Sequence, residues 1–215
     1  IDASLVAFGW ALHDTEVPVG SPERCPQKGL FRTPARMEFI DRYVSHRESL
    51  VALIQRTRPD RVGLEFPVFK NLFSEGCYGL FLFVCEALKS QSCDVVFWSP
   101  MQAKAHARDS IDRPKGWKME KQDMIEVARW DTGIRQWNHN EADAYLIARI
   151  SGRFWKLQEG LLGGSELTPT ETRYFTDDSL VRRAGKFRKR GVIYREDERY
   201  FAWSNRNQET EDGKE

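Results

Sequence analysis

Short apolar segments alternate with longer amphipathic segments through the first 155 residues, and this alternation limits the fold more than any other feature. Residues 61–65 (RVGLE) and 93–98 (CDVVFW) are short, apolar and bounded by polar residues or proline, which is typical of buried strands. Leu5 to His13 predicts another strand, and Ile1-Asp2 has the pattern of a strand end. The sequence predicts helices over about 34–57, 72–90, 100–108, 118–132 and 141–155. Strands that alternate with helices predict an α/β fold with helices on both faces of a sheet.

Local signals set the expected boundaries of these elements. Thr33 before Pro34 has the pattern of an N-cap followed by the first turn of a helix. The segment 14–28 contains three prolines and one glycine, which predicts a loop or an irregular hairpin. Ser99-Pro100 repeats the capping pattern before the segment 100–108.

Overall charge and hydropathy exclude some classes of protein, and the composition changes between two regions of the chain. The 215 residues contain 33 Lys and Arg against 32 Asp and Glu, so a uniformly basic DNA-coating protein is excluded and any nucleic-acid contact needs local basic patches. No apolar run approaches the roughly 20 residues that cross a bilayer. We expect a domain over 1–160 and a basic extension over 161–215 with a hairpin and a flexible tail.

The spacing of the cysteines and the start of the sequence lead to expectations about zinc binding, the cellular compartment and upstream residues. None of the four cysteines forms a Cys-x-x-Cys pair, which disfavours a structural zinc site. No secretory signal peptide is visible, so we expect the reducing cytoplasm of a bacterium, or of its host for a phage-encoded protein. The sequence begins at Ile1 rather than Met, so we expect further residues upstream.

Three acidic residues lie at the ends of predicted strands or in the start of a predicted helix: Asp2, Glu65 and Asp143. Each alone is typical of a solvated strand end or helix start. Carboxylates that converge repel one another unless a cation lies among them, and Mg²⁺ prefers such hard oxygen ligands. Two divalent ions about 4 Å apart can cleave a phosphodiester bond with an activated water. The three acids together therefore imply a divalent-metal site, and cleavage of a phosphodiester bond uses sites of this kind.

The segments around these acids resemble the RuvC-like Holliday junction resolvases of the RNase H-like superfamily. The resemblance covers about residues 1–155, and its motifs are specific only in their combined order and spacing. It is carried by Ile1-Asp2 with Phe8-Gly9-Trp10-Ala11, Val62-Gly63-Leu64-Glu65 with 68–71, Val96 to Lys104, Gly116 to Met124, and Asn140-Glu141-Ala142-Asp143-Ala144.

This resemblance implies an RNase H-like mixed sheet flanked by helices, and an endonuclease that nicks four-way DNA junctions symmetrically. It implies that Asp2, Glu65 and Asp143 bind two Mg²⁺ or Mn²⁺ ions per active site. Many family members carry Asp-x-x-Asp on the last helix, whereas Asn140 stands three residues before Asp143 here. Asn140 or Glu141 is expected to assist, and the fourth ligand stays open.

The resemblance also implies contacts to DNA. Lys104, Lys118 and Lys121 are expected to grip phosphates, although a solvated charged surface explains them equally well. Phe69 is the candidate wedge at a branch point, or else a core residue at the start of a helix. The remaining candidates for DNA contact are Lys70, Lys115, and Arg188 and Lys189 of the basic run 182–190.

The predicted helix 72–90 is apolar on more than one face. It is either a central core helix or the two-fold interface of a homodimer, which would match the symmetry of a four-way junction.

Three other functions stay open: an RNase H-type nuclease for hybrids, a flap or branched-DNA nuclease, and a junction-binding protein without catalysis.

Overall fold

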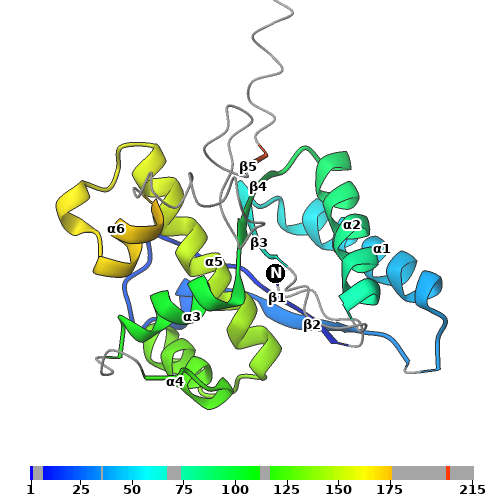
Figure 1. Cartoon of the computed structure of the whole chain (residues 1–215), viewed down its shortest axis with the longest axis horizontal. Helices are drawn as coiled ribbons and strands as arrows, with labels where there is room; N and C mark the ends of the chain where they lie inside the picture. Colours follow the sequence, from blue (N-terminus) through cyan, green and yellow to red (C-terminus); the bar gives the residue numbers. More distant parts are fainter. Residues whose placement is uncertain (2–6, 35, 67–73, 112–116, 176–201, 204–215) are drawn as a thin grey trace, which may run out of the picture.

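The computed structural model of the chain describes residues 1, 7–34, 36–66, 74–111, 117–175 and 202–203 (Figure 1). The elements run in the order β1 (Ala7–Ala11), β2 (Lys28–Arg32), α1 (Phe39–Thr57), β3 (Arg61–Glu65), α2 (Ser74–Ser90), β4 (Asp94–Trp98), α3 (Pro100–Arg108), α4 (Lys121–Thr132), α5 (His139–Gln158), α6 (Pro169–Phe175) and β5 (Ala202–Trp203). Short 3-10 helices cover Pro22–Arg24 and Gly164–Glu166.

The strands form two small sheets. β1 and β2 are antiparallel, while β3 and β4 are parallel with Glu65 opposite Trp98, and β5 adds to β4 in the antiparallel direction. Ile1 extends the second sheet, because its backbone nitrogen donates to the carbonyl of Gly63 (2.8 Å) and its carbonyl accepts from the backbone nitrogen of Glu65 (3.0 Å). This alternating pattern is that of a parallel pair.

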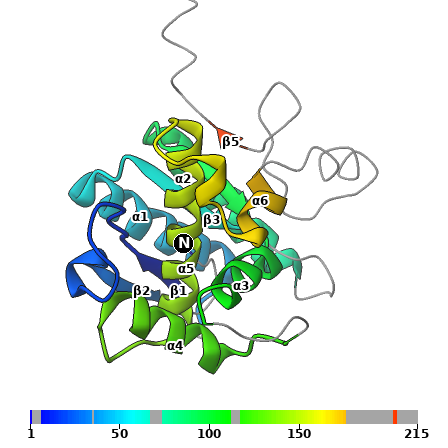
Figure 2. The ribbon, with the colours of Figure 1, turned by 90° about the vertical axis from the view of Figure 1, so that its left-hand side faces the viewer.

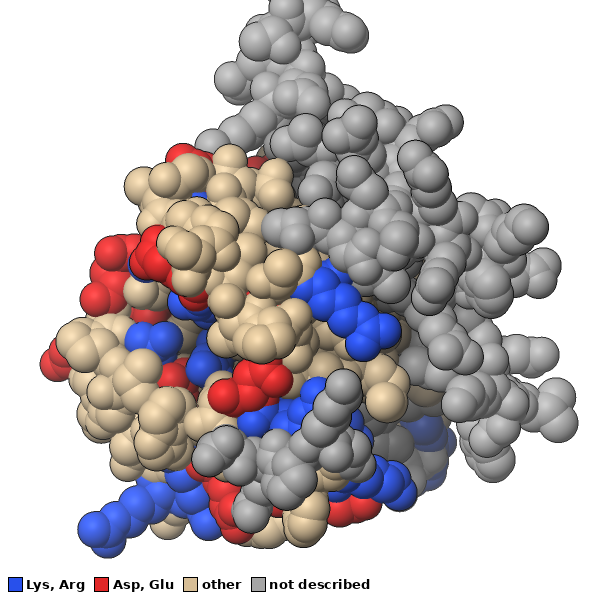
Figure 3. Space-filling model, turned by 60° about the vertical axis from the view of Figure 1, so that its left-hand side comes forward, with Lys and Arg blue, Asp and Glu red and all other residues tan. Residues whose placement is uncertain are grey.

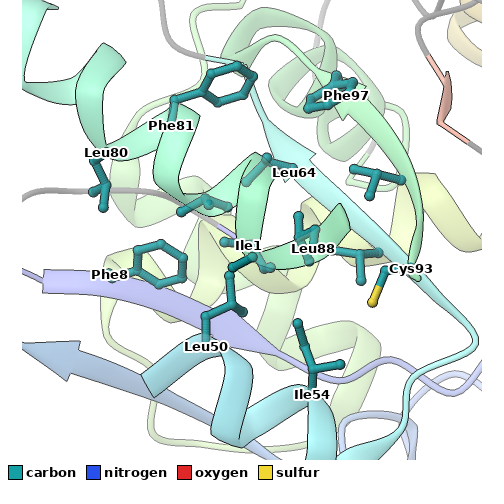
Figure 4. Close-up of a cluster of buried hydrophobic side chains, with 14 of the residues drawn as sticks. Ile1, Phe8, Leu50, Ile54, Leu64, Leu80, Phe81, Leu88, Cys93 and Phe97 are labelled. Atoms are coloured by element: carbon teal, nitrogen blue, oxygen red, sulfur yellow. The ribbon is translucent and has the colours of Figure 1, made fainter. Parts of the chain in front are cut away.

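Helices cover both sides of the strands. α1 and α2 lie on one side, and α3, α4 and α6 lie on the other, with α5 running along the strands between them (Figures 1 and 2). A cluster of buried apolar side chains fills the space between α1, α2 and the strands, including Phe8, Leu50, Leu64, Leu80 and Leu88 (Figure 4). The predicted α/β fold, with helices on both sides of the strands, is confirmed.

Two glycines let α5 pack directly on the strand backbones. A Cβ atom at Gly63 of β3 would lie 2.0 Å from Oγ of Ser151 and 3.0 Å from the carbonyl of Ile147, both on α5. A Cβ atom at Gly9 of β1 would lie 2.3 Å from the carbonyl of Asn140, at the start of α5. Since no real Cβ makes such contacts, any larger side chain at either position would push α5 away from the strands.

Most predicted elements are confirmed. β3 has the predicted bounds, β4 begins one residue later than predicted, and the helices fall within a few residues of their expected positions. The loop 14–28 leads into β2, so the predicted hairpin forms. None of the helices in the described ranges is long and apolar enough to cross a membrane.

The predicted helix start at Thr33-Pro34 is wrong. The backbone nitrogen of Met37 donates to the carbonyl of Pro34 in a separate turn, and α1 begins at Phe39 with Glu38 as its extended N-cap. α6 was not predicted either, because its segment was expected to be a charged extension. A signal was present, since Thr168-Pro169 followed by Glu171 is a capping-box pattern, and the folded chain forms this box.

We predict that Gly63→Ala destabilises the protein by about 1–3 kcal/mol, because the added methyl group meets Ser151 and the backbone of α5. Urea unfolding measures the change. Gly164→Ala is the matched control, since a Cβ there meets no atom within 4 Å. Equal stability of the two variants would contradict the close packing of α5 on β3.

Candidate active site

A pocket of about 280 Å³ opens at the carboxyl ends of β3 and β4, between α3, α4 and α5. Parallel strands commonly place binding sites at this edge of a sheet. The pocket brings together five of the residues that the sequence predicted for the site. Its lining consists of Glu65, Pro100, Ala103, Lys104, Lys121, Met124, Asn140, Asp143 and Ile147.

Local structure explains why the acidic and amide side chains meet. Glu65 is the last residue of β3. The start of α5 is fixed by a capping box, in which the Asn138 side chain accepts from the backbone nitrogen of Asn140 (3.0 Å) and the Glu141 side chain accepts from that of Asn138 (3.0 Å). Asn140 and Asp143 are three residues apart and therefore share one face of the helix, which faces the pocket.

Asp143 has a buried oxygen without a partner. Its Oδ1 is inaccessible to solvent and accepts no hydrogen bond from any of the described residues. Burial raises the pKa of Asp143 above its ordinary value, although Lys104, His139 and Lys121 oppose this shift. A buried carboxylate oxygen that lacks a donor is costly unless a cation satisfies it. Asp143 therefore fits a hard divalent ion such as Mg²⁺ or Mn²⁺.

Asn140 is held so that its carbonyl is the group left for a ligand. Its Nδ2 donates to the backbone carbonyl of Ala7 on β1 (2.5 Å), and the residue is 9% exposed. This bond links the start of α5 to β1 at the position where Gly9 allows close approach. The side-chain oxygen of Asn140 is thus the atom that it can offer to a metal ion or to a water molecule.

Positive potential surrounds the acidic groups. Pro100 and Lys121 are the first residues of α3 and α4, so three helices including α5 begin at the pocket. Helix N-termini favour anions, and the ammonium groups of Lys104 and Lys121 add full positive charges to the same wall. The pocket therefore combines oxygen ligands for a cation with groups that attract a phosphate.

Two predicted site residues lie away from this pocket. The Glu141 carboxylate accepts from Nζ of Lys28 (2.8 Å) as well as from the cap of α5, and it does not line the pocket. Lys118 precedes α4, its side chain is 89% exposed, and it pairs with Glu120 (3.4 Å). On the face of the molecule shown in Figure 3, the described lysine and arginine side chains lie among aspartates and glutamates.

Six predicted site residues lie outside the described residues: Asp2, Phe69, Lys70, Lys115, Arg188 and Lys189. Within the described ranges, no group of three or more His, Cys, Asp or Glu side chains converges. Glu65 and Asp143 are therefore the two described carboxylates of the candidate site.

A second, larger cavity of about 610 Å³ lies at the amino end of β3. Core side chains such as Leu50, Ile54 and Val62 form part of its lining. It contains none of the side chains predicted for the site, so its size alone does not make it a candidate.

The role of Glu141 was missed from the sequence, although a signal was present. Asn138 followed three residues later by Glu141 is a capping-box pattern, and such a pattern commits the acidic side chain to the helix start. The convergence of three helix starts was also missed, because it depends on how α3, α4 and α5 are placed in space.

Comparison with known proteins supports the fold. No family model and no curated protein sequence matches the chain. Among solved structures, RuvC of Thermus thermophilus in complex with a Holliday junction substrate matches with a TM-score of 0.57 and 16% identity, over 73% of this chain and 93% of that one. Another Thermus thermophilus RuvC structure matches with a TM-score of 0.56 and 16% identity, over 74% and 94%. The chain therefore has the fold of RuvC.

We predict that Asp143→Asn stabilises the metal-free protein at neutral pH, because burial disfavours the charged carboxylate. The folded pKa lies above the ordinary 3.8, so the penalty is complete above the folded pKa and disappears as the pH falls through it to below 3.8. Thermal unfolding in a chelator should show a rise in Tm near pH 7.5 that vanishes near pH 3.

The exposed Asp60 provides the control. Asp60→Asn should leave the Tm unchanged at both pH values. A destabilised Asp143→Asn variant at pH 7.5 would contradict the electrostatic description of the pocket.

Proposed function

We propose that this chain, which has the fold of RuvC, is a metal-dependent endonuclease that nicks four-way DNA junctions at symmetry-related phosphodiesters. The observation that carries the proposal is the meeting of Glu65 and Asp143 in one pocket, where a buried Asp143 oxygen lacks a partner among the described residues. The fold supports it independently, because a RuvC with the same fold is solved in complex with a Holliday junction substrate.

The proposed ligands are the carboxylates of Asp2, Glu65 and Asp143 and the side-chain carbonyl of Asn140. Support for Asp2 comes from its neighbour Ile1, whose backbone is hydrogen-bonded to Gly63 and Glu65. Two Mg²⁺ or Mn²⁺ ions would supply the Lewis acidity that polarises the phosphate and makes water nucleophilic near neutral pH. Glu141 is left out, because its carboxylate is committed to Lys28 and to the start of α5.

The other residues of the pocket would position the scissile phosphate. Lys104 and Lys121 each place a positive charge in its wall, and the starts of α3 and α4 favour a phosphate oxygen. Ala103, Met124 and Ile147 supply apolar walls, which strengthen electrostatic interactions by limiting the water around them. In this arrangement, charge that develops on the phosphate during cleavage meets groups that are already oriented.

Contacts farther along the DNA are proposed for the exposed Lys118 and for residues outside the described part of the chain. Phe69 would insert at the branch point with Lys70 beside it, and Lys115, Arg188 and Lys189 would contact phosphates. Such contacts position the backbone without reading its sequence. We therefore expect recognition to depend mainly on the branched shape of the DNA.

We propose a homodimer formed through α2. Its inner face is part of the core, with Leu80, Val84 and Leu88 buried, while Tyr78 and Leu82 on its outer side are 43% and 49% exposed. The neighbouring α1 adds the exposed apolar side chains of Ile40 and Val44. A homodimer with two-fold symmetry across this face would place its two active sites on one four-way junction, which also has two-fold symmetry.

A nuclease for hybrids or flaps and a junction-binding protein without catalysis are the alternatives. Cleavage of a four-way junction, an RNA–DNA hybrid and a flap by the same preparation, with and without Mg²⁺, separates them. The proposal expects junction nicking that requires the metal.

We predict that Asp2→Asn, Glu65→Gln or Asp143→Asn lowers junction cleavage by on the order of 100-fold or more, because each removes a charged ligand. Binding to the junction in Ca²⁺ should be retained, as judged by gel shift. Glu141→Gln keeps the cap of α5 and should retain cleavage, since its side chain lies away from the pocket. Full activity of any of the first three variants refutes the assignment of that ligand.

We predict that Leu82→Glu converts the dimer to a monomer, because it places an unpaired charge in the proposed interface. Sedimentation velocity measures the change. Leu161→Glu is the control, since Leu161 is 68% exposed on another surface and its replacement should not alter the mass in solution. A monomeric wild-type protein, both alone and on a junction, would contradict the proposed dimer.

A further inference from the structure

Helix α6 lies in the part of the chain beyond the predicted nuclease domain. In this protein α6 packs beside α3, as both views of the ribbon show (Figures 1 and 2). Its contacts tie a segment that was expected to be an extension to the helices of the predicted domain.

Glu171 on α6 joins two other helices through one buried carboxylate. The residue is 0% exposed, and its carboxylate contacts Nε2 of His106 on α3 (2.9 Å) and Nη2 of Arg153 on α5 (2.9 Å). Burial alone would raise the pKa of Glu171, but the hydrogen bonds from His106 and Arg153 outweigh it and bring the pKa to about 2. The carboxylate is therefore charged at neutral pH and binds both helices.

Two further contacts attach α6 to the same helices. The backbone nitrogen of Thr170 donates to the side chain of Asp109 at the end of α3 (3.2 Å). The ring of Phe175 packs against Trp98 of β4 and Phe154 of α5, with centroids 5.7 and 5.6 Å away. Ala103 and Ile147 belong to the same apolar cluster and also form the wall of the acidic pocket, so α6 supports that wall from behind.

The helices that Glu171 joins are those that form the pocket. Lys104 lies two residues before His106 on α3, and Asp143 precedes Arg153 on α5. Both Lys104 and Asp143 line the pocket. The orientation of α3 relative to α5 therefore decides where the Lys104 ammonium lies with respect to the Asp143 carboxylate.

We infer that α6 braces the active site, and that Glu171 is a positioning residue that holds Lys104 opposite Asp143 through the bridge between His106 and Arg153. The inference rests on the proposed function, because Lys104 has its role there. Loss of the bridge leaves His106 and Arg153 without their shared acceptor, which lets α3 move relative to α5. A displacement of about 1 Å at a reacting centre can lower a rate up to 100-fold.

The first test is a double-mutant cycle on junction cleavage at saturating Mg²⁺. Glu171→Gln should lower kcat at least tenfold, and Glu166→Gln should not change it, since Glu166 is an exposed acid just before α6. In a Lys104→Ala background, Glu171→Gln should lower kcat by less than a further twofold. If the kcat losses of the two single variants multiply in the double variant, Glu171 does not act through Lys104, and the inference is overturned.

The second test uses the metal-free protein and needs no activity. Hydrogen exchange of the amides of α3 should be at least tenfold faster in Glu171→Gln than in Glu166→Gln, because the brace restrains this helix. Unchanged exchange overturns the inference. If Glu171→Gln does not fold, His106→Leu replaces it in both tests, since this change spares the pair of Glu171 with Arg153.

These tests separate the inference from the proposed function. A wild-type protein that cuts no junction under any metal condition refutes the proposed function, whereas the exchange measurement still decides whether α6 restrains α3. Faster exchange together with an unchanged kcat in an active protein overturns the positioning role and leaves the nuclease intact.

Discussion

The direct packing of α5 on the strand backbones controls the position of every group in the candidate site. Gly9 and Gly63 leave no Cβ between the strands and the helix, so α5 approaches both strands at backbone distance. Asp143 lies between these two contact points in the helix sequence, and Glu65 ends the strand that carries the second glycine. A larger side chain at either glycine would separate the two carboxylates, because close-packed interiors cannot absorb an added methyl group without a shift.

This packing creates a site whose buried carboxylate destabilises the folded protein when no ligand is bound. A carboxylate of raised pKa is buried without a hydrogen-bond donor from the described residues, and lysines and helix starts surround it. Such an arrangement does not serve stability. It would suit a site that holds a cation and an anionic phosphate side by side, because binding of both would offset the free energy that burial of the carboxylate costs.

The part of the chain after α5 contributes to this site from outside. Buried salt bridges often add little net stability, because desolvation offsets the attraction between the charges. What the Glu171 bridge does supply is a defined geometry, since one carboxylate can accept from His106 and Arg153 together only when α3 and α5 are correctly placed. A segment whose sequence indicated a charged extension thus includes an element that packs against the core of the domain.

The strands and most of the helices could be predicted from the sequence, because apolar periodicity and caps are local properties. The segment RVGLE predicted β3 with its correct ends, and Ser99-Pro100 marked the start of α3. The family resemblance likewise singled out Glu65 and Asp143, and the folded chain brings both into one pocket. By contrast, the start of α1 was misplaced, because the turn after Pro34 imitates a helix start over a few residues.

Only the tertiary structure decided how the candidate ligands are used. Asn140, Glu141 and Asp143 are equally polar neighbours in the sequence, yet one is tied to β1 through its amide nitrogen, one caps α5 and pairs with Lys28, and one keeps a buried oxygen without a partner among the described residues. The partners of Asn140 and Glu141 lie on β1 and β2, which are more than a hundred residues away from α5 in the sequence. The sequence by itself determined which elements form and which residue types are present, whereas long-range packing determined which of their atoms remain for a ligand.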